Sequence, residues 1–217
     1  MADTSHLELR EQFSTPEQQR ESAISGMWIF IVTELMLFGG LFVAFTVYRL
    51  RYPAAFTRGS SEMEYWMGAL NTGILISSSL TMSLAEYFVA QNKSMRGAIL
   101  LLVTILLGAA FLGIKFTEYY LHFHDHKMPA FGFEETGPFA PQVQLFFVFY
   151  YVMTGLHSLH LLIGIGLVFF MFVPTALRSL NAEYHTPLDN TSLYWHFIDV
   201  IWVFLFAIFY IPGAHIR

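Results

Sequence analysis

Five long runs of apolar residues decide what this chain can fold into. They cover residues 24–48, 65–90, 97–120, 142–174 and 193–212. Each is as long as the roughly 20 residues that a helix needs to cross a bilayer. The runs are continuous, whereas the strands of a membrane barrel show about ten residues of alternating character. We therefore predict an all-α integral membrane bundle of five transmembrane helices. A polar segment at 1–23 precedes a membrane domain at 24–217.

The composition agrees with a lipid solvent and excludes several classes of function. Only 12% of the residues are charged, about half the share that is usual in a soluble domain. The net charge is −5 and no basic run occurs, so nucleic acid is not an expected partner. The chain has no cysteine, which excludes disulfides, iron–sulfur clusters and metal centres held by thiolates.

The segments between the runs are too short to fold into domains, at 49–64, 91–96, 121–141 and 175–192. The positive-inside rule does not orient the chain, because the basic residues divide equally between the two sides. The side of the N-terminus would carry Arg10, Arg20, Lys93, Arg96 and Arg178, and the opposite side Arg49, Arg51, Arg58, Lys127 and Arg217.

Glu34 is the ionisable residue deep in the first run, about 15 Å along a helix that begins at residue 24. An ionisable group at that depth is costly and usually faces protein or water. No basic residue lies within helical reach of Glu34. Two interpretations stay open: a structural carboxyl that is hydrogen-bonded to a neighbouring helix, or a group for proton transfer or partner docking.

His157 and His160 lie near the middle of the fourth run, and their spacing of three places them on one helix face. Gly164 continues that face and would let another helix approach closely. The interpretations are interhelical hydrogen bonding or a haem or metal site. Two histidines at this spacing cannot provide both axial ligands of one haem, so a second helix would have to contribute.

The fifth run contains His196 and Asp199, also three apart, and we expect the carboxylate to hydrogen-bond the imidazole. Trp195, Asp199, Trp202 and Phe206 form a stripe that is typical of a seam between helices. Elsewhere, Lys115 and Glu118 form a pair of opposite charge near the end of the third run, which favours structural neutralisation.

Three alternating histidines and an aspartate follow the third run, and they are tempting as metal ligands. We expect the segment to be a loop in a wet interface, where histidine needs no metal. These residues are His122, His124, Asp125 and His126.

Motifs in each of the five runs, in order along the chain, resemble subunit III of the haem–copper oxidases. Leu-Met-Leu-Phe-Gly-Gly-Leu-Phe follows Glu34, Leu-Asn-Thr at 70–72 and Ala-Glu-Tyr at 85–87 come next, and Glu-Tyr-Tyr stands at 118–120. Thr-Gly-Leu-His-Ser-Leu-His at 154–160 resembles that family's Thr-Gly-x-His-x-x-His. Tyr-Trp-His-Phe-Ile-Asp-Val-Ile-Trp at 194–202 resembles its Tyr-Trp-His-Phe-x-Asp-x-x-Trp. The likeness covers nearly all of the chain from Trp28 onward.

The resemblance implies an accessory, non-catalytic subunit of a proton-pumping terminal oxidase. Members support the catalytic subunit I and its proton uptake, and haem and copper lie in the partner subunits rather than in this chain. The family's buried polar pattern falls on residues that share the membrane interior: Glu34, Glu118, His157, His160, Trp195, His196 and Asp199. Glu34, where quinol-oxidase members tend to carry Asp, favours the cytochrome c oxidase branch.

The resemblance also implies a bacterial cytoplasmic membrane, with the N-terminus cytoplasmic and the C-terminus outside, and membership in a larger respiratory assembly. Members bind phospholipid, although this chain lacks the first two helices of seven-helix members, which form one wall of a lipid-filled cleft. The alternatives are a subunit of a quinol oxidase, a protein associated with nitric oxide reductase, an independent membrane haem protein using His157, His160 and His196, or a proton-coupled transporter using Glu34 and Asp199.

Overall fold

The computed structural model describes residues 12–129, 139–180 and 185–214, and within them every regular element is a helix. The long helices are α1 (Pro16–Arg51), α3 (Tyr65–Ala90), α4 (Ser94–His124), α5 (Ala140–Ala176) and α6 (Thr186–Phe209). Two short helices, α2 (Pro53–Ser61) and α7 (Ile211–Ala214), lie together at one end. Five segments are long and apolar enough to cross a membrane, which confirms the predicted bundle.

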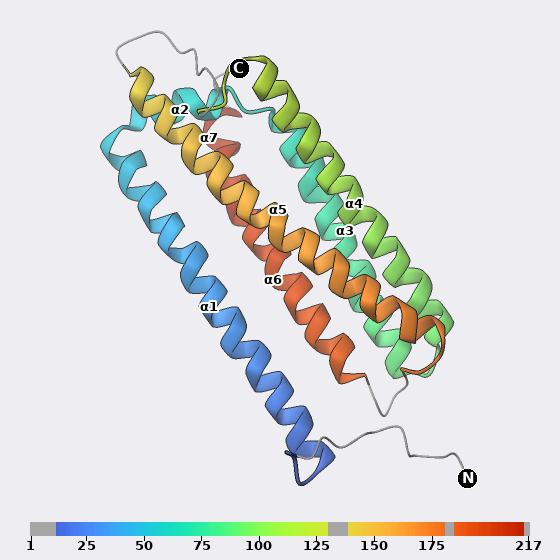
Figure 1. Cartoon of the computed structure of the whole chain (residues 1–217). Coiled ribbons are helices and arrows are strands. Elements are labelled where there is room, and N and C mark those ends of the chain that lie inside the picture. Colours follow the sequence, from blue (N-terminus) through green and yellow to red (C-terminus); the bar gives the residue numbers. More distant parts are fainter. Residues whose placement is uncertain (1–11, 130–138, 181–184, 215–217) are drawn as a thin grey trace, which may run out of the picture.

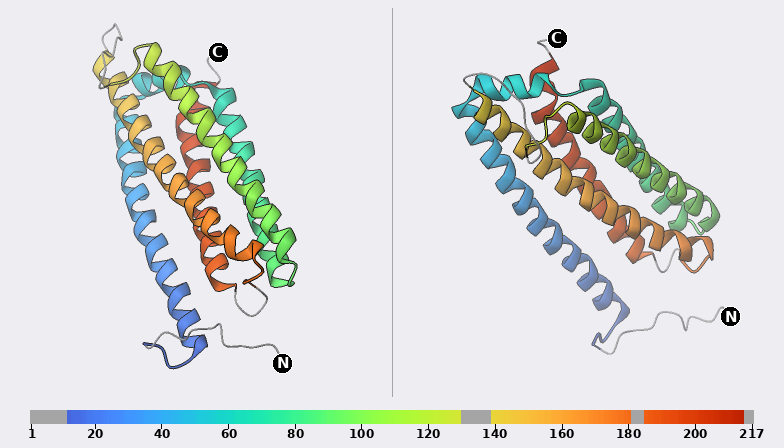
Figure 2. Two further views of the ribbon diagram at one scale, coloured as in Figure 1. Left: turned by 45° about the vertical axis from the view of Figure 1, so that its right-hand side comes forward. Right: turned by 45° about the horizontal axis from the view of Figure 1, so that its top comes forward.

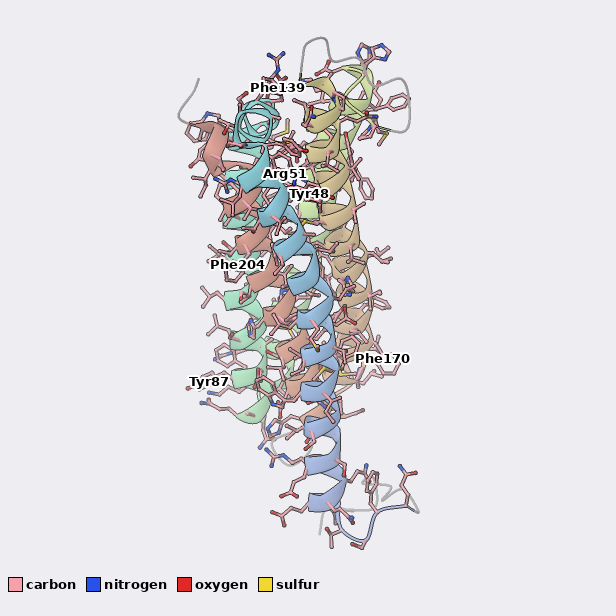
Figure 3. All side chains as sticks on the ribbon, turned by 90° about the vertical axis from the view of Figure 1, so that its left-hand side faces the viewer. Tyr48, Arg51, Tyr87, Phe139, Phe170 and Phe204 are labelled. Atoms are coloured by element: carbon pink, nitrogen blue, oxygen red, sulfur yellow. The ribbon has the colours of Figure 1, made fainter. Side chains whose placement is uncertain are left out.

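The helices lie side by side, inclined in the same direction (Figures 1 and 2). α1 flanks the bundle on one side, where it contacts α6 and α5, and α3 packs along α4 on the other side. α1 begins at the end of the bundle opposite to α2 and α7. Large apolar side chains such as Phe170 and Phe204 lie on the outside (Figure 3), as expected for a surface that faces lipid.

The first helix begins eight residues before the predicted apolar run because local signals start it at Pro16. Thr15 caps it by accepting a hydrogen bond from the backbone N–H of Gln18 at 3.2 Å, and Pro16 occupies the first helical turn. Its 36 residues span about 54 Å at roughly 1.5 Å per residue, so α1 extends beyond the hydrocarbon layer. Residues 1–11 of the predicted polar segment lie outside the described part of the chain.

Three of the long helices end in the same type of turn. At each of these ends the residue with positive φ is not glycine. Asn92, His126 and Arg178 adopt φ values of 61°, 54° and 60° after α3, α4 and α5. In each case the next backbone N–H donates to the carbonyl five residues earlier, as from Lys93 to Phe88 at 2.9 Å. This is the Schellman arrangement, which satisfies carbonyls at the helix end.

Two of the connections contain helical structure. Residues 53–61 form α2, which Pro53 starts and which packs against α5 and α7. The histidine-rich segment is helical as far as His124, and His122 is buried against Phe147 and Tyr150 rather than lying in a wet loop. The expectation of a loop was wrong there because the apolar face of α4 continues for one more turn.

Candidate functional site

Lys115 and Glu118 of α4 form a fully buried ion pair, with Nζ and Oε2 2.9 Å apart. The ammonium group also donates to the hydroxyls of Tyr150 on α5, at 2.8 Å, and Tyr210 at the end of α6, at 2.7 Å. Its three N–H bonds are therefore all used. Tyr210 in turn donates to Glu118 Oε1 at 2.8 Å. The predicted pair is confirmed, and it joins three helices.

Aromatic rings surround this ammonium group. Nζ lies 4.6 Å from the ring centroid of Tyr150, 5.2 Å from Trp202 and 5.3 Å from Tyr119. Each ring presents π-electron density that attracts a cation, most strongly where water is excluded. The site therefore stabilises a charge inside the bundle.

Glu34 contacts His160 across the interface between α1 and α5, with Oε2 and Nε2 3.0 Å apart. The other imidazole nitrogen, Nδ1, lies 2.8 Å from the carbonyl of Leu156. Because a carbonyl only accepts, Nδ1 carries a proton. Either a neutral carboxyl donates to a neutral imidazole or an imidazolium donates to a carboxylate, and the pair is uncharged as a whole in both cases. Hydrogen bonding of Glu34 to a neighbouring helix is thereby confirmed.

His157 differs from its neighbour three residues later. It is fully buried beside the rings of Phe111, at 5.6 Å between centroids, and Trp202, at 5.2 Å. Among the described residues neither of its nitrogens has a hydrogen-bond partner. Interhelical hydrogen bonding was therefore right for His160 and wrong for His157, which instead packs as an aromatic side chain.

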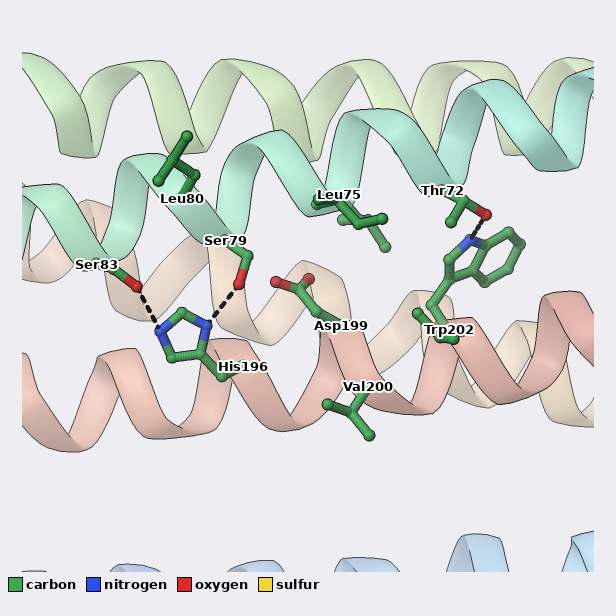
Figure 4. Close-up of a pocket in the computed structure, with 11 residues that line it drawn as sticks. Thr72, Leu75, Ser79, Leu80, Ser83, His196, Asp199, Val200 and Trp202 are labelled. Atoms are coloured by element: carbon green, nitrogen blue, oxygen red, sulfur yellow. Dashed lines mark hydrogen bonds between the residues drawn. The ribbon is translucent and has the colours of Figure 1, made fainter.

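His196 does not bond to Asp199, contrary to the sequence-based expectation. Its ring nitrogens instead form hydrogen bonds with hydroxyl groups of α3 (Figure 4). The Oγ atom of Ser79 lies 2.7 Å from Nδ1, and that of Ser83 lies 3.1 Å from Nε2. Ser192, one turn earlier on α6, lies 3.2 Å from Nε2. The serines of α3 compete successfully because they face the imidazole directly from the adjacent helix.

Trp195 and Trp202 confirm the predicted seam on α6. Both indoles are fully buried, and their N–H groups donate to Ser78 and Thr72 of α3, each at 3.1 Å. The ring of Trp195 fits between glycines of two other helices: a Cβ at Gly108 of α4 would lie 2.9 Å from it, and one at Gly164 of α5 3.2 Å. Gly164 therefore admits α6 of the same chain.

The sequence-predicted residues thus form separate contacts rather than one reactive centre. Sequence reasoning missed Tyr150 and Tyr210, which complete the Lys115 site, and Ser79 and Ser83, which hold His196. The two tyrosines stand in apolar runs like many other aromatics of this chain. The serines carried a usable signal, since Ser77, Ser78, Ser79 and Ser83 cluster in one span.

Comparisons with known proteins agree with the motifs. The family model described as cytochrome c oxidase subunit III matches residues 17–214. A cytochrome c oxidase subunit 3 of Bacillus subtilis is 30% identical over 217 residues, covering 95% of this chain and 99% of that protein. A quinol oxidase subunit 3 of the same organism is 29% identical, covering 96% and 97%. A cytochrome bo(3) ubiquinol oxidase subunit 3 of Pseudomonas aeruginosa is 29% identical, covering 89% and 86%. This multi-pass membrane protein therefore belongs to the cytochrome c oxidase subunit III family of the haem–copper oxidases.

Proposed function

We propose that this chain is the accessory, non-catalytic subunit III of a proton-pumping cytochrome c oxidase. In this role it associates with the catalytic subunit I, which carries haem and copper, and supports proton uptake into it. The observation that carries the proposal is the family match over residues 17–214, which includes all five spanning segments except the first residue of α1.

The contacts of the buried histidines argue against an independent haem protein. Both ring nitrogens of His160 are engaged, by Glu34 and by a backbone carbonyl, and both nitrogens of His196 are engaged by serine hydroxyls. Iron would have to displace these partners. The carboxyl of Glu34 is likewise committed to His160, so a transporter would have to break that contact in each cycle.

Purification from the native membrane tests this proposal. A tagged chain should bring down subunits that carry haem and copper, and the free chain should show no haem absorption. Oxygen consumption by the purified complex identifies the electron donor. We expect activity with reduced cytochrome c. Activity with quinol alone would instead favour a quinol oxidase, as named for the relatives at 29% identity.

We place the chain in a bacterial cytoplasmic membrane with its N-terminus inside and its C-terminus outside. The count of five candidate spans supports this proposal, because a chain that crosses a membrane an odd number of times has its two ends on opposite sides. Reporter fusions at both ends measure this directly, and we expect cytoplasmic reporters to be active only at the N-terminus. Two reporters on the same side would contradict the count of five spans.

Replacing Glu34 by glutamine should leave assembly and turnover nearly unchanged. The amide keeps the shape and can donate to Nε2 of a neutral His160, but it cannot exchange a proton. The measurement is the pH profile of oxygen consumption for both proteins in the same membranes. Superimposable profiles support a structural role. A fall in turnover with intact assembly, most marked at high pH where protons are scarce, would assign Glu34 to proton transfer.

A further inference from the structure

A groove of about 460 Å³ lies between α3 and α6 on the surface of the bundle. Figure 4 shows its polar groups on facing helices: Ser79 and Ser83 on α3, and His196 and Asp199 on α6. Ile76 and Leu80, which are 60% and 61% exposed, line it as well. The groove is therefore open toward whatever surrounds the bundle.

Asp199 is the polar group of this groove whose hydrogen-bonding capacity is largely unused. It is 92% buried, being 8% exposed, and within the described residues neither carboxyl oxygen has a hydrogen-bond partner. The carboxyl points from α6 toward α3, between Leu75 and Ser79 (Figure 4). Ser79 is bonded to His196. Ser79 also interacts with the carboxyl of Asp199, outside the distance or angle of a regular hydrogen bond. No lysine or arginine lines the groove, so most of the hydrogen-bonding capacity of the carboxyl is left for a donor from outside the groove.

The depth of Asp199 decides against lipid as that donor. It lies near the middle of α6, whereas polar lipid headgroups begin about 15 Å from the centre of a hydrocarbon layer that is roughly 30 Å thick. Acyl chains reach this depth but have no hydrogen-bond donor. A carboxyl left unpaired in hydrocarbon costs several kcal/mol.

Small residues are exposed on the outer surface of α3 beside large apolar ones such as Ile76 and Leu80. Gly73, Ser77 and Ser83 are exposed on it, and a Cβ at Gly73 would meet nothing within 4 Å. α3 is also the least apolar of the five spanning segments. Small residues on a transmembrane helix mark places where another helix approaches closely.

We propose that the groove between α3 and α6 is the docking site for a transmembrane helix of a partner oxidase subunit, which carries a hydrogen-bond donor at the depth of Asp199. The inference rests on the proposed function, because it requires a partner. The inference specifies which surface of this chain contacts the partner, and that a hydrogen bond to Asp199 holds the two together. The helix lies along the small residues of α3, and its donor satisfies the carboxyl that this chain leaves unpaired.

Photo-crosslinking from two matched positions tests the location. Leu80 lines the groove and Leu106 lies on α4, and the two leucines are 61% and 60% exposed. A diazirine-bearing amino acid is encoded at either position of the full chain in its native membrane. We expect position 80 to crosslink a subunit of the complex and position 106 to label lipid. Crosslinking at position 80 to lipid alone, to a second copy of this chain or to nothing would overturn the proposal.

Two substitutions test the chemistry. Asp199→Leu should lower co-purification of the partner by about threefold to tenfold, the usual worth of one hydrogen bond between membrane helices. Asp199→Asn, which still accepts and donates, should retain it. The thermal stability of the isolated chain should not fall in either variant, because the carboxyl makes no regular hydrogen bond with the described residues of the chain. Undiminished co-purification of the leucine variant, or a lower melting temperature of the isolated chain, would contradict docking through Asp199.

Experiments on the wild-type chain distinguish a failure of the proposed function from a failure of the proposed docking site. If it brings down no oxidase subunit from its native membrane, the proposed function fails. If it brings down the complex while position 80 crosslinks only lipid, the proposed function stands and the assignment of this groove fails.

Discussion

Replacing Lys115 by methionine should destabilise the folded chain by about 3–5 kcal/mol, the range observed when one partner of a buried ion pair is removed. The side chain is 1% exposed. Without its ammonium group, the carboxylate of Glu118 and the hydroxyls of Tyr150 and Tyr210 lose their shared partner inside the bundle. The measurement is the thermal melting temperature in detergent, together with the amount of folded protein in the membrane.

A second ion pair of the chain provides the matched control. Lys127 Nζ and Glu62 Oε2 are only 2.6 Å apart, but their side chains are 26% and 33% exposed. Ion pairs that water reaches in this way contribute about 0–1 kcal/mol, because water screens their charges. Lys127→Met should therefore change the melting temperature little. Replacing both members of the buried pair, as Lys115→Met with Glu118→Leu, should recover part of the loss. Equal effects of the two lysine substitutions would show that burial is not what makes the Lys115 contact important.

Gly164→Leu should disrupt the packing of α5 against α6. A Cβ alone would lie 3.2 Å from Ile198 Cδ1 and 3.2 Å from Trp195 Cε3, and leucine adds three more carbons. Inserting methylenes into a packed interior costs about 1–3 kcal/mol, and more where the backbone cannot move. Trp195 has little room to yield because a Cβ at Gly108 would also press on it, at 2.9 Å. We expect a lower melting temperature for the isolated chain.

Gly166, two residues farther along α5, is the control for this substitution. A Cβ at Gly166 would meet nothing within 4 Å, so leucine fits there without contact inside the chain. Gly166→Leu should therefore leave the melting temperature of the isolated chain unchanged or slightly higher, since leucine also favours the helix. A loss of stability as large as that of Gly164→Leu would mean that the loss comes from altering the helix itself rather than from Trp195.

Gly164 shows what the periodicity of a single helix can and cannot predict. Its spacing from His160 correctly predicted that another helix approaches closely, but the spacing does not say whether that helix belongs to this chain or to another subunit. The structure shows that the approaching helix is α6 of the same chain. Periodicity identifies a face of a helix, but it carries no information on which of several helices covers that face.

The hydrogen-bond partners of the histidines likewise could not be predicted from spacing along one helix. Lys115 and Glu118 lie on one helix, so their spacing alone brings them together. His196 and Asp199 have the same spacing, yet His196 bonds to Ser79 and Ser83 of α3. A hydrogen-bond partner on a neighbouring helix replaces one on the same helix where packing places it next to the imidazole ring. Likewise, His157 and His160 share a face, but only His160 meets a carboxyl from α1.

The lipid environment explains which features could be predicted from the sequence alone. Each span must be long, apolar and internally hydrogen-bonded. The sequence by itself therefore determined the number of spanning helices, their approximate extents and which polar and ionisable residues lie within the spans. Helix ends depended partly on local backbone geometry, as the positive φ of His126 and Arg178 shows. Only the tertiary structure decided the pairing of the buried polar groups. It joined Glu34 to His160, completed the Lys115 site with two distant tyrosines, and left Asp199 facing a groove. The reason is geometric: a hydrogen bond requires atoms within about 3 Å in the right direction, and the distances between atoms on different helices are set by packing.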